Sequence, residues 1–324
     1  MSQHLQPSPS TVHWGYLDAT LRPVASVRSG ESIVLSSVSG FASELPDDPR
    51  FHVLDAHREI LARVRPEIGP HILTGPVAVE GARAGDVLEA RIDSIELIQN
   101  WGFNYTRPGR GALPARFGER RLFHIGIDAH SKIATCPWGM HLPLRPFFGI
   151  MAVAPAPAYG RVSTIEPREY GGNVDNRELV AGARLFLPVF VDGALFSVGD
   201  GHACQGDGEV NLCALETALQ GRFTLILHQG GSLGLPRATT PDHFITMAFD
   251  PDLNVAAEAA LHAMVDALVA CLRLDPYEAY ALCSMACDLR ITQVVDGNKG
   301  VHAVFPRSLC PQVSETAFAL GQAD

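Results

Sequence analysis

The sequence predicts a predominantly β protein of the α+β class. Of its 324 residues, 30 are glycine and 23 are proline, and these punctuate short segments rich in β-branched side chains as far as about residue 250. Helical spacing of apolar residues is clear only in the C-terminal quarter. With 47% hydrophobic and 19% charged residues, the chain can bury one large core or two to three smaller ones.

Strand patterns are clearest in four segments, 32–38, 87–98, 148–154 and 184–191. These segments are rich in β-branched residues, and apolar and polar residues alternate best in the first two. In the second segment Asp93 and Ser94 interrupt the alternation, which predicts a β-bulge at that point.

The segment 100–121 contains four glycines, two prolines and five arginines, which predicts a long loop. Loops of that length are usually functional or mobile, so we expect a lid or a subunit contact there. The alternation of Trp101, Phe103 and Tyr105 places three aromatic rings on one face. Such a stripe either lines a substrate mouth or packs in the core or at an interface.

Two helices and a strand are expected near the C-terminus. Apolar residues at i, i+3, i+4 and i+7 predict an amphipathic helix over 254–272. A second helix is expected to start at Asp275, because a proline and a glutamate follow in its first turn. A strand over 289–295 comes next, with residues 296–300 as its turn.

Composition excludes several classes of protein. Twenty-five basic against thirty-five acidic residues give a formal net charge of -10 without a Lys/Arg cluster, so we expect no nucleic-acid partner. The N-terminus has no basic region followed by an apolar one, and no run approaches eighteen apolar residues, so we expect a cytoplasmic protein without a membrane partner. The seven cysteines show no CxxC pair, which indicates reduced thiols.

Residues 197–210, SVGDGHACQGDGEV, gather glycines, acids, a histidine and a cysteine after an apolar run. A Walker loop needs a lysine where Asp207 stands, and the acids here would repel the pyrophosphate of a dinucleotide. An EF-hand loop needs further oxygen ligands after Asp200, where this chain has a histidine. Phosphate-binding and EF-hand loops are therefore excluded.

A metal site or an acid/base site remains for this segment. Asp200 and His202 are two residues apart, so an extended strand places both side chains on one face, and Asp207 and Glu209 do the same after the Gly206 turn. Carboxylate and imidazole ligands suit zinc or a similar first-row ion. The alternative is a glycine-rich turn with solvated acids and a core histidine.

Residues 171–210 resemble the signature of the acetamidase/formamidase family, which has GGN-x-D, then LPVFV-x-GALFS-x-GD, then H-A-x-Q-GDGEV. Residues 75–87, 144–155 and 288–296 are similar to other blocks of that family. The resemblance extends over most of the chain, from about residue 20 to about residue 306.

The resemblance implies a mainly β fold, with a jelly-roll-like β-sandwich, a small β-barrel and an α+β C-terminal part. We expect residues 1–165 to hold the sandwich and barrel strands, 166–250 to hold the two motifs, and 251–324 to form the helical part, all packed as one unit. The family hydrolyses short amides such as formamide and acetamide, and some relatives are zinc-dependent lactamases. A small-molecule amide or lactam is therefore the expected substrate.

Several residues fall on motif positions of the family: Asn173, Asp175, Asp200, His202, Gln205, Asp207 and Glu209. From ligand chemistry we predict that Asp175, Asp200 and His202 bind a divalent metal, zinc first and calcium as the alternative. Glu209 is the predicted general base, which then protonates the leaving amine. Gln205 and Asn173 either stabilise the oxyanion and bind the substrate amide or hold a loop.

Glu80, in VEGARAGD, is a second candidate for the proton shuttle, and a solvated turn acid is the alternative. Asp86 of the same segment is expected to form the turn itself. Four N-terminal histidines lack ligand spacing and are expected at the surface or in the core: His13, His52, His57 and His71. Of these, His52 and His71 flank the strand-rich part that leads to the family block and are the two to inspect.

Two alternatives to a metal-dependent amidase stay open. Cys204 beside Glu209 imitates part of the nitrilase set, although the family often has alanine at this position. A non-catalytic β-rich module that binds an ion or small ligand would use the same acidic loop. A homo-oligomer, a dimer or higher, is expected from the Arg/Gly-rich loop and the large apolar fraction.

Overall fold

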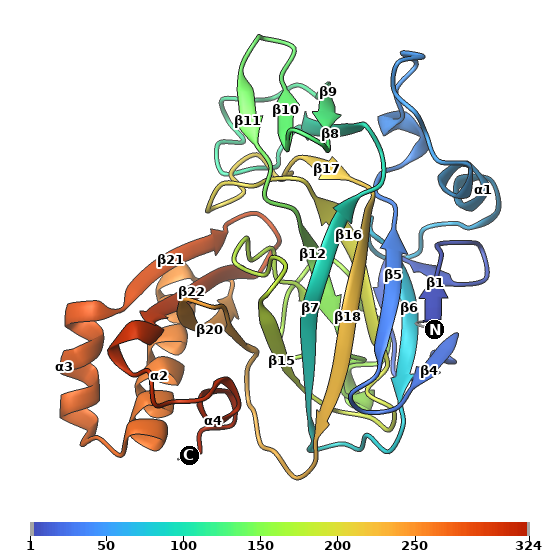
Figure 1. Cartoon of the computed structure of the whole chain (residues 1–324). Helices are drawn as coiled ribbons and strands as arrows, with labels where there is room; N and C mark the ends of the chain where they lie inside the picture. The colour runs from blue at the N-terminus through green and yellow to red at the C-terminus, as the bar shows by residue number, and fades with distance from the viewer. Residues whose placement is uncertain (1–2, 323–324) are drawn as a thin grey trace.

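The computed structural model describes residues 3–322, and it is mainly β, as the sequence predicted. One sheet has nine strands, which come from segments spread over residues 3–306 (Figure 1). In spatial order these are β1 (Gln3–Leu5), β5 (Ser32–Ser37), β18 (Leu219–His228), β7 (Val87–Leu97), β15 (Arg184–Pro188), β19 (Arg237–Thr239), β20 (His243–Asp250), β22 (Lys299–Pro306) and β21 (Asp288–Gln293).

The second sheet has eleven strands. Its main path is β11 (His141–Pro143), β10 (Ile133–Thr135), β9 (Arg121–Asp128), β8 (Trp101–Thr106), β17 (Glu216–Thr217), β16 (Phe196–His202), β12 (Phe147–Ala152) and β14 (Gly171–Asn173). A branch is formed by β6 (Ile72–Val79), which pairs with β16, and by β2 (Val12–Trp14) and β4 (Ala25–Val27), which pair with β6. A separate pair joins β3 (Tyr16–Leu17) to β13 (Val162–Ser163).

The main core lies between the two sheets. Fully buried Leu88 of β7 and Phe223 of β18 belong to one cluster with Phe148 of β12 and Phe196 of β16. Phe223 makes edge contacts with both of those rings, at centroid distances of 5.4 and 5.7 Å. The two sheets are therefore held together by a shared apolar layer, whereas the jelly-roll and small-barrel details remain predictions.

The predicted β-bulge at Asp93 is confirmed. Strand β7 pairs with β18 so that Arg222 faces Ser94 and Phe223 faces Ile92, which leaves Asp93 outside the register. The Asp93 carboxylate accepts a hydrogen bond of 2.6 Å from Thr224. The extra polar residue is thus satisfied at the surface while the apolar residues on both sides keep their face.

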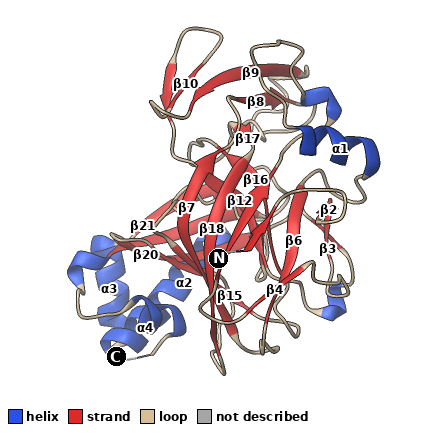
Figure 2. Ribbon diagram, turned by 45° about the vertical axis from the view of Figure 1, so that its right-hand side comes forward, coloured by secondary structure: helices blue, strands red, loops and turns tan. Residues whose placement is uncertain are grey.

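Within residues 3–322, four α-helices accompany the sheets, and three of them gather at the C-terminal end (Figure 2). These are α1 (Asp55–Arg63), α2 (Leu253–Leu272), α3 (Pro276–Ala286) and α4 (Glu315–Leu320), with short 3-10 turns at Ala42–Glu44, Pro157–Tyr159 and Arg307–Leu309. The Asp275 side chain caps α3 as predicted. Sequence analysis missed α1, a short helix whose buried side chains are limited to His57 and Ile60.

Helix α2 has the length and mean hydropathy, 1.7, of a membrane-spanning helix. In this fold one face of it packs against the sheet, where Met264 and Leu268 join Phe244 and Phe305 in a second core cluster. Helices that cover the core of a protein meet the same criterion of length and composition.

The prediction of a loop over 100–121 is correct only for its second part. Its first part is strand β8, and only residues 107–120 lack regular structure. The seven cysteines, all among the described residues, are free thiols.

Candidate functional site

The site forms where strands β14, β16 and β17 and three loops meet around β12. Ile150 of β12 pairs with Asn173 on one side and with Gly199 on the other, which brings the GGNVD and GDGH segments to the same level. Thr217 and Glu216 of β17 pair with Gly201 and His202 on the far edge of β16. The register of the sheet therefore assembles side chains that are far apart in sequence.

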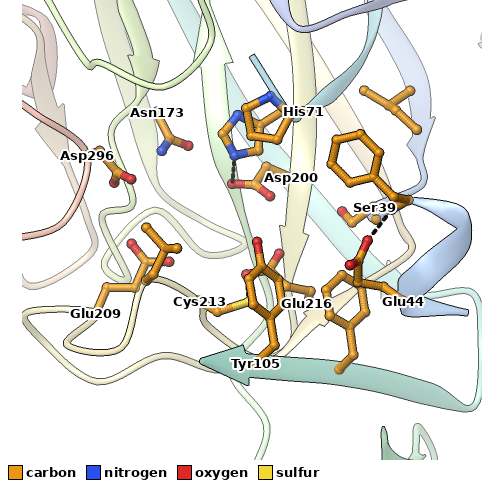
Figure 3. Close-up of a pocket in the computed structure, with 16 residues that line it drawn as sticks. Ser39, Glu44, His71, Tyr105, Asn173, Asp200, Glu209, Cys213, Glu216 and Asp296 are labelled. Carbon is orange, nitrogen blue, oxygen red and sulfur yellow. Dashed lines mark hydrogen bonds and ion pairs between the residues drawn. The ribbon is translucent and has the colours of Figure 1, made fainter. Parts of the chain in front are cut away.

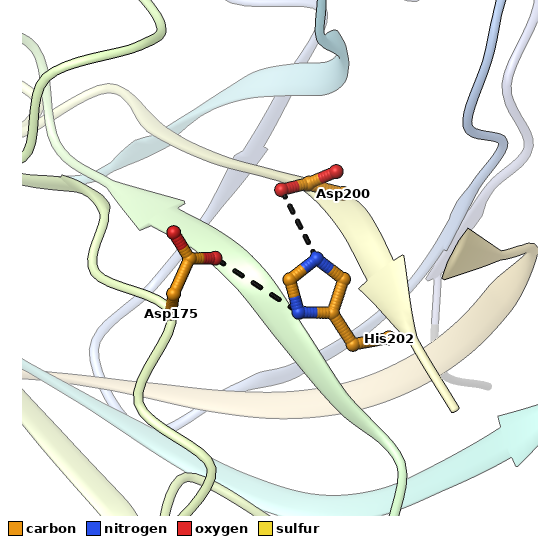
Figure 4. Close-up of side chains that lie close together, drawn as sticks. All are labelled: Asp175, Asp200 and His202. Carbon is orange, nitrogen blue, oxygen red and sulfur yellow. Dashed lines mark ion pairs between the residues drawn. The ribbon is translucent and has the colours of Figure 1, made fainter. Parts of the chain in front are cut away.

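His202 lies at the centre of the site and is fully buried (Figure 4). Its Nε2 atom is 3.3 Å from Asp200 Oδ2 and 3.3 Å from Glu216 Oε2, and its Nδ1 atom is 3.9 Å from Asp175 Oδ1. One imidazole is thus surrounded by three carboxylates.

Gln205 fixes the orientation of that imidazole. Its Nε2 donates to the carbonyl oxygen of Asp175 at 2.9 Å, so its Oε1 faces His202 Nδ1, also at 2.9 Å, and accepts the Nδ1 proton. The Nε2 atom of His202 is then the one that faces Asp200 and Glu216. Gln205 therefore holds the loop and the ring, and it lines the neighbouring groove, whereas it is not among the residues that line the cavity beside the cluster.

The potential metal ligands form three overlapping groups of three residues. Within each group, the ligand atoms lie within 4.8 Å of one another. The groups are Asp175, Asp200 and His202; His202, Glu209 and Glu216; and Asp175, Glu209 and Asp296. The structure therefore brings together the three residues predicted to bind metal and places Glu209, the predicted base, beside them. We call these six side chains the acid cluster.

Several atoms of the acid cluster are buried without a hydrogen-bond partner among the described residues. They are both carboxylate oxygens of Asp175, Glu209 Oε2, Glu216 Oε2, Asp296 Oδ2 and His202 Nε2. Burying unsatisfied polar groups costs roughly 1–3 kcal/mol each, and more when they are charged. Such an arrangement is suited to a bound cation.

The pKa shifts of the acid cluster also indicate a site where negative charges are crowded and a cation would be stabilised. Burial and neighbouring carboxylates raise the pKa of Asp175 and Glu209 well above their usual values, and burial raises that of Asp296 to about 7. Burial also acts to raise the pKa of Asp200, but His71 and His202 outweigh it and hold that pKa below its usual range. Glu216 and Asp200 raise the pKa of His202 against the effect of burial.

The backbone of the site is strained at three of its acids. Asp175, Asp200 and Glu209 have φ values of 46°, 56° and 42°, in the left-handed region that residues with a Cβ seldom adopt. Each such residue costs on the order of 1 kcal/mol and persists only where surrounding structure imposes it. The strained backbone that directs these carboxylates inward therefore lowers the stability of the fold.

Gly149 of β12 forms the floor below the cluster. A Cβ atom at this position would lie 2.6 Å from Asp175 Oδ1, 2.7 Å from His202 Cε1 and 2.8 Å from Asp200 Oδ2. Only glycine leaves room for the three side chains to converge.

A cavity of about 50 Å³ opens beside the cluster (Figure 3). Asn173, Asp200, Glu209, Glu216 and Asp296 form its acidic wall, while the other wall comes from the segment around Ser39–Glu44, from His71 and from Phe103 and Tyr105. This space accommodates a few water molecules or a very small organic molecule.

Three of the residues singled out in the N-terminal half line the cavity: His71, Phe103 and Tyr105. His71 accepts or donates a 3.0 Å hydrogen bond between Nδ1 and Thr164, and its Nε2 is 3.9 Å from Asp200 Oδ2. In the aromatic stripe, Trp101 packs in the core whereas Phe103 and Tyr105 face the cavity, so both interpretations of the stripe apply.

The other histidines lie elsewhere. His13 is buried and binds the Tyr16 carbonyl and the Ser197 hydroxyl, and burial lowers its pKa to about 4. His57 is buried and binds the Gly40 carbonyl, and His52 is exposed.

Glu80, the second candidate for the proton shuttle, lies away from the cavity. It is exposed and follows Val79 at the end of β6, whereas the cavity is lined by Ile72 at the start of that strand. The glycine-rich turn leaves its carboxylate in solvent. Asp86 forms the turn as predicted, accepting from the backbone N–H groups of Arg83 and Gly230.

Asp207 does not converge with the other acids. It is partly exposed and lies 3.9 Å from Arg177 Nε, outside the acid cluster. The positive φ values of Gly208 and Glu209, 98° and 42°, turn the chain so that only Glu209 points inward. The alternation expected of a strand fails because this segment is a loop.

Cys204 lies outside the cavity, in an apolar groove with Cys136 and Trp138. Burial raises the pKa of its thiol to about 11, which disfavours the thiolate that a nucleophile requires.

Sequence analysis missed Glu216 as a site residue and placed Asp296 only in a turn. Glu216 had a signal, since it is a lone acid inside the apolar run LCALETAL, where charged residues are rarely buried without a role. Asp296 closes the family-like block 288–296, but nothing in its local sequence distinguishes it from a turn residue.

Comparison with known proteins is consistent across sequence and structure. The model of the acetamidase/formamidase family matches residues 19–161 and 157–229. An acetamidase of Mycolicibacterium smegmatis is 56% identical in an alignment 205 residues long, which covers 44% of this chain and 50% of that protein. The crystal structure of an acetamidase from Bacillus halodurans is 28% identical, with a TM-score of 0.83, and the match covers 96% of this chain and 99% of that one.

A gamma lactamase from Delftia acidovorans shares the fold, with a TM-score of 0.63 at 22% identity over 93% of this chain and 89% of that one. The chain spans about half the length of the curated relatives it matches. The family match extends over more than half of this chain and contains most residues of the acid cluster. The chain belongs to the acetamidase/formamidase family.

Proposed function

We propose that this protein hydrolyses a small linear amide, such as formamide or acetamide, or a lactam, to a carboxylate and ammonia or an amine. The observation that carries the proposal is the buried acid cluster around His202, which adjoins a cavity of about 50 Å³. Family membership and the similarity to acetamidases support the same type of reaction.

We also propose that the acid cluster holds a divalent cation. The residues fit a cation because the buried atoms of the acid cluster that lack a hydrogen-bond partner in the described chain are carboxylate oxygens and an imidazole nitrogen, all of which can bind metal. Asp175, Asp200 and His202 would hold the ion, and Glu216 is within reach of the same imidazole nitrogen. Imidazole with carboxylates suits zinc or another first-row ion, whereas carboxylates alone suit calcium. When bound, the cation would act as a Lewis acid and lower the pKa of water.

Glu209 is the group that we propose to take a proton from water and return it to the leaving nitrogen. Its side chain is buried in the cluster and lines the cavity, so it can contact a substrate. Burial and the neighbouring Asp296 raise its pKa, so the carboxyl holds a proton more readily than an exposed glutamate does, as a group that returns a proton to the leaving nitrogen requires.

Asn173 is the residue that we propose to bind the amide. It lines the cavity, and its Oδ1 atom is buried without a partner in the described part of the chain. A carboxamide oxygen accepts hydrogen bonds, so it suits the N–H groups of a substrate amide. Binding of these groups would direct the substrate carbonyl toward the acid cluster.

Release of ammonia or amine from a panel of amides tests the function. Formamide, acetamide, two lactams and an aryl amide would be assayed with and without a chelator. Hydrolysis of at least one of them, lost on chelation, supports the proposal. Failure on every amide by protein that carries bound metal would instead favour a non-catalytic ion-binding module.

A further inference from the structure

Residues 107–120 form a strap that runs from the end of β8, which carries the cavity-lining Tyr105, to the start of β9. All of them except Gly111 are exposed, and they have no regular secondary structure. Segments with few buried contacts open at low free energy, and loops of this length are often functional. The position of the strap is therefore determined by a small number of tethers.

The first tether is Arg120. Its Nη2 atom forms an ion pair with Glu44 Oε1, and its guanidinium lies 5.7 Å from the centre of the Tyr105 ring. Glu44 and Tyr105 both line the cavity. The last residue of the strap thus contacts two residues of one cavity wall that come from different parts of the sequence.

Glu44 connects Arg120 to the turn that forms part of the cavity wall. Its side chain is buried and also accepts hydrogen bonds from the Phe41 backbone, at 2.7 Å, and from the Ser43 hydroxyl, at 2.8 Å. Phe41 lines the same cavity. The ion pair with Arg120 therefore fixes the whole turn around Glu44 against the strap.

The second tether joins the strap to the loop that carries Glu209. The Ala112 backbone N–H donates to the Val210 carbonyl at 2.7 Å, and Val210 directly follows Glu209. The strap consequently spans from the aromatic wall to the acidic wall of the cavity.

We propose that Arg120 is a specificity-determining residue that latches the strap closed and thereby restricts the cavity to very small amides. This inference rests on the proposed function for its substrate class. With the latch closed, Glu44 and Tyr105 confine a space of about 50 Å³, which suits formamide or acetamide better than an amide with a large acyl group. Release of Arg120 would free the Glu44 and Tyr105 side chains and admit larger acyl groups.

The test compares Arg120→Gln with Arg116→Gln. Both remove one arginine charge from the same strap, but Arg116 stacks only on the exposed ring of Phe117. The first readout is the specificity ratio, kcat/KM for acetamide divided by kcat/KM for benzamide. The second is the rate of trypsin cleavage after Arg110, a bond present in the wild type and in both variants.

Arg120→Gln is expected to lower the specificity ratio about tenfold and to raise cleavage after Arg110 about tenfold, as expected for the loss of one charge-assisted hydrogen bond. Arg116→Gln should change neither by more than about twofold, the usual range for a surface substitution. An unchanged ratio and unchanged cleavage in Arg120→Gln, or equal effects in Arg116→Gln, would overturn the latch.

Two further measurements distinguish failure of the latch from an inactive wild-type protein and from an unfolded variant. If wild-type protein hydrolyses no amide, the proposed function fails, while protection of the Arg110 bond by Arg120 still decides whether the latch exists. If Arg120→Gln is unfolded by circular dichroism, Arg120→Lys replaces it, because lysine keeps the charge opposite Glu44 but loses the planar group over Tyr105. Cleavage at the wild-type rate in Arg120→Lys, with an unchanged specificity ratio, would then refute the role of the guanidinium.

Discussion

His202 Nε2 lies 3.3 Å from Asp200 Oδ2, and the two residues come from alternate positions of the same strand, β16. Both residues are buried, with 0% of His202 and 8% of Asp200 exposed, and their strand runs through the middle of the site. This relationship makes the pair the fixed part of the acid cluster, around which residues from three loops and a neighbouring strand are arranged.

His202→Ala should therefore release the metal and abolish activity together. The substitution removes the only nitrogen ligand of the described cluster, and a missing ligand of a three-ligand site cannot be replaced by water without large loss of affinity. Metal content per chain, measured by mass spectrometry, and ammonia release are the readouts. His262→Ala, at an exposed position of α2, is the matched control and should keep both. A His202→Ala protein with full metal content would contradict the assignment.

Part of this pair could be predicted from the sequence, because two residues at alternate positions of a strand are expected on a common face, but the left-handed φ of 56° at Asp200 is not predicted by that alternation. The bulge at Asp93 was predictable for the same reason. Both predictions depend on local backbone geometry alone.

The remainder of the site depends on topology. Glu216 reaches His202 because β17 pairs with β16, and Asp296 reaches Asp175 because of the loop that follows β21. No local pattern encodes those pairings. The positions of Glu80 and Asp207 outside the cluster could not be foreseen for a related reason, since the sequence around a turn acid is the same whether the chain directs it to solvent or to a cavity.

Glu209→Gln should keep the metal and slow turnover by about 10²–10⁴-fold, the usual contribution of general acid–base catalysis. Glutamine preserves the size of the side chain but cannot accept a proton from water. The measurement is kcat for acetamide together with metal content. If the variant turns over at the wild-type rate, another group in the cavity must move the proton, with His71 the next to substitute.

Cys204→Ala should retain most activity. The thiol lies in the apolar groove outside the cavity, and its pKa is raised to about 11, so little thiolate is present at neutral pH. Activity before and after treatment with iodoacetamide provides the check. A folded, metal-loaded Cys204→Ala protein without activity would support a covalent mechanism through Cys204 and Glu209 instead.

The metal-free protein should lose stability as the pH rises. Burial raises the pKa of Asp296 to about 7, and those of Asp175 and Glu209 are raised as well. In the unfolded chain these groups titrate near about pH 4. Between the two values the folded state holds protons that the unfolded state has released. The free energy of unfolding therefore falls by about 1.4 kcal/mol per pH unit for each such proton.

Urea unfolding of the metal-free protein at about pH 5, 6 and 7 measures this slope. The metal-loaded protein is the control, since a bound cation favours the ionised carboxylates and should remove the fall. Stability that is constant or rises with pH in the metal-free protein would mean that the cluster carries fewer protons than its burial implies.

Gly149→Ala should damage the site without touching any ligand. The added methyl group would lie 2.6 Å from Asp175 Oδ1 and 2.8 Å from Asp200 Oδ2, and those oxygens are held by strained backbone that has little freedom to move. We expect a loss of roughly 1–3 kcal/mol in the free energy of unfolding, as for other overpacked interiors, together with weaker metal binding. Gly126→Ala is the matched control, because it lies in β9 of the same sheet and the nearest atom to its added methyl group would be 3.7 Å away. Thermal unfolding and metal titration of the two variants provide the comparison. Equal metal affinity in Gly149→Ala and Gly126→Ala would show that the acid cluster does not converge over β12 as described.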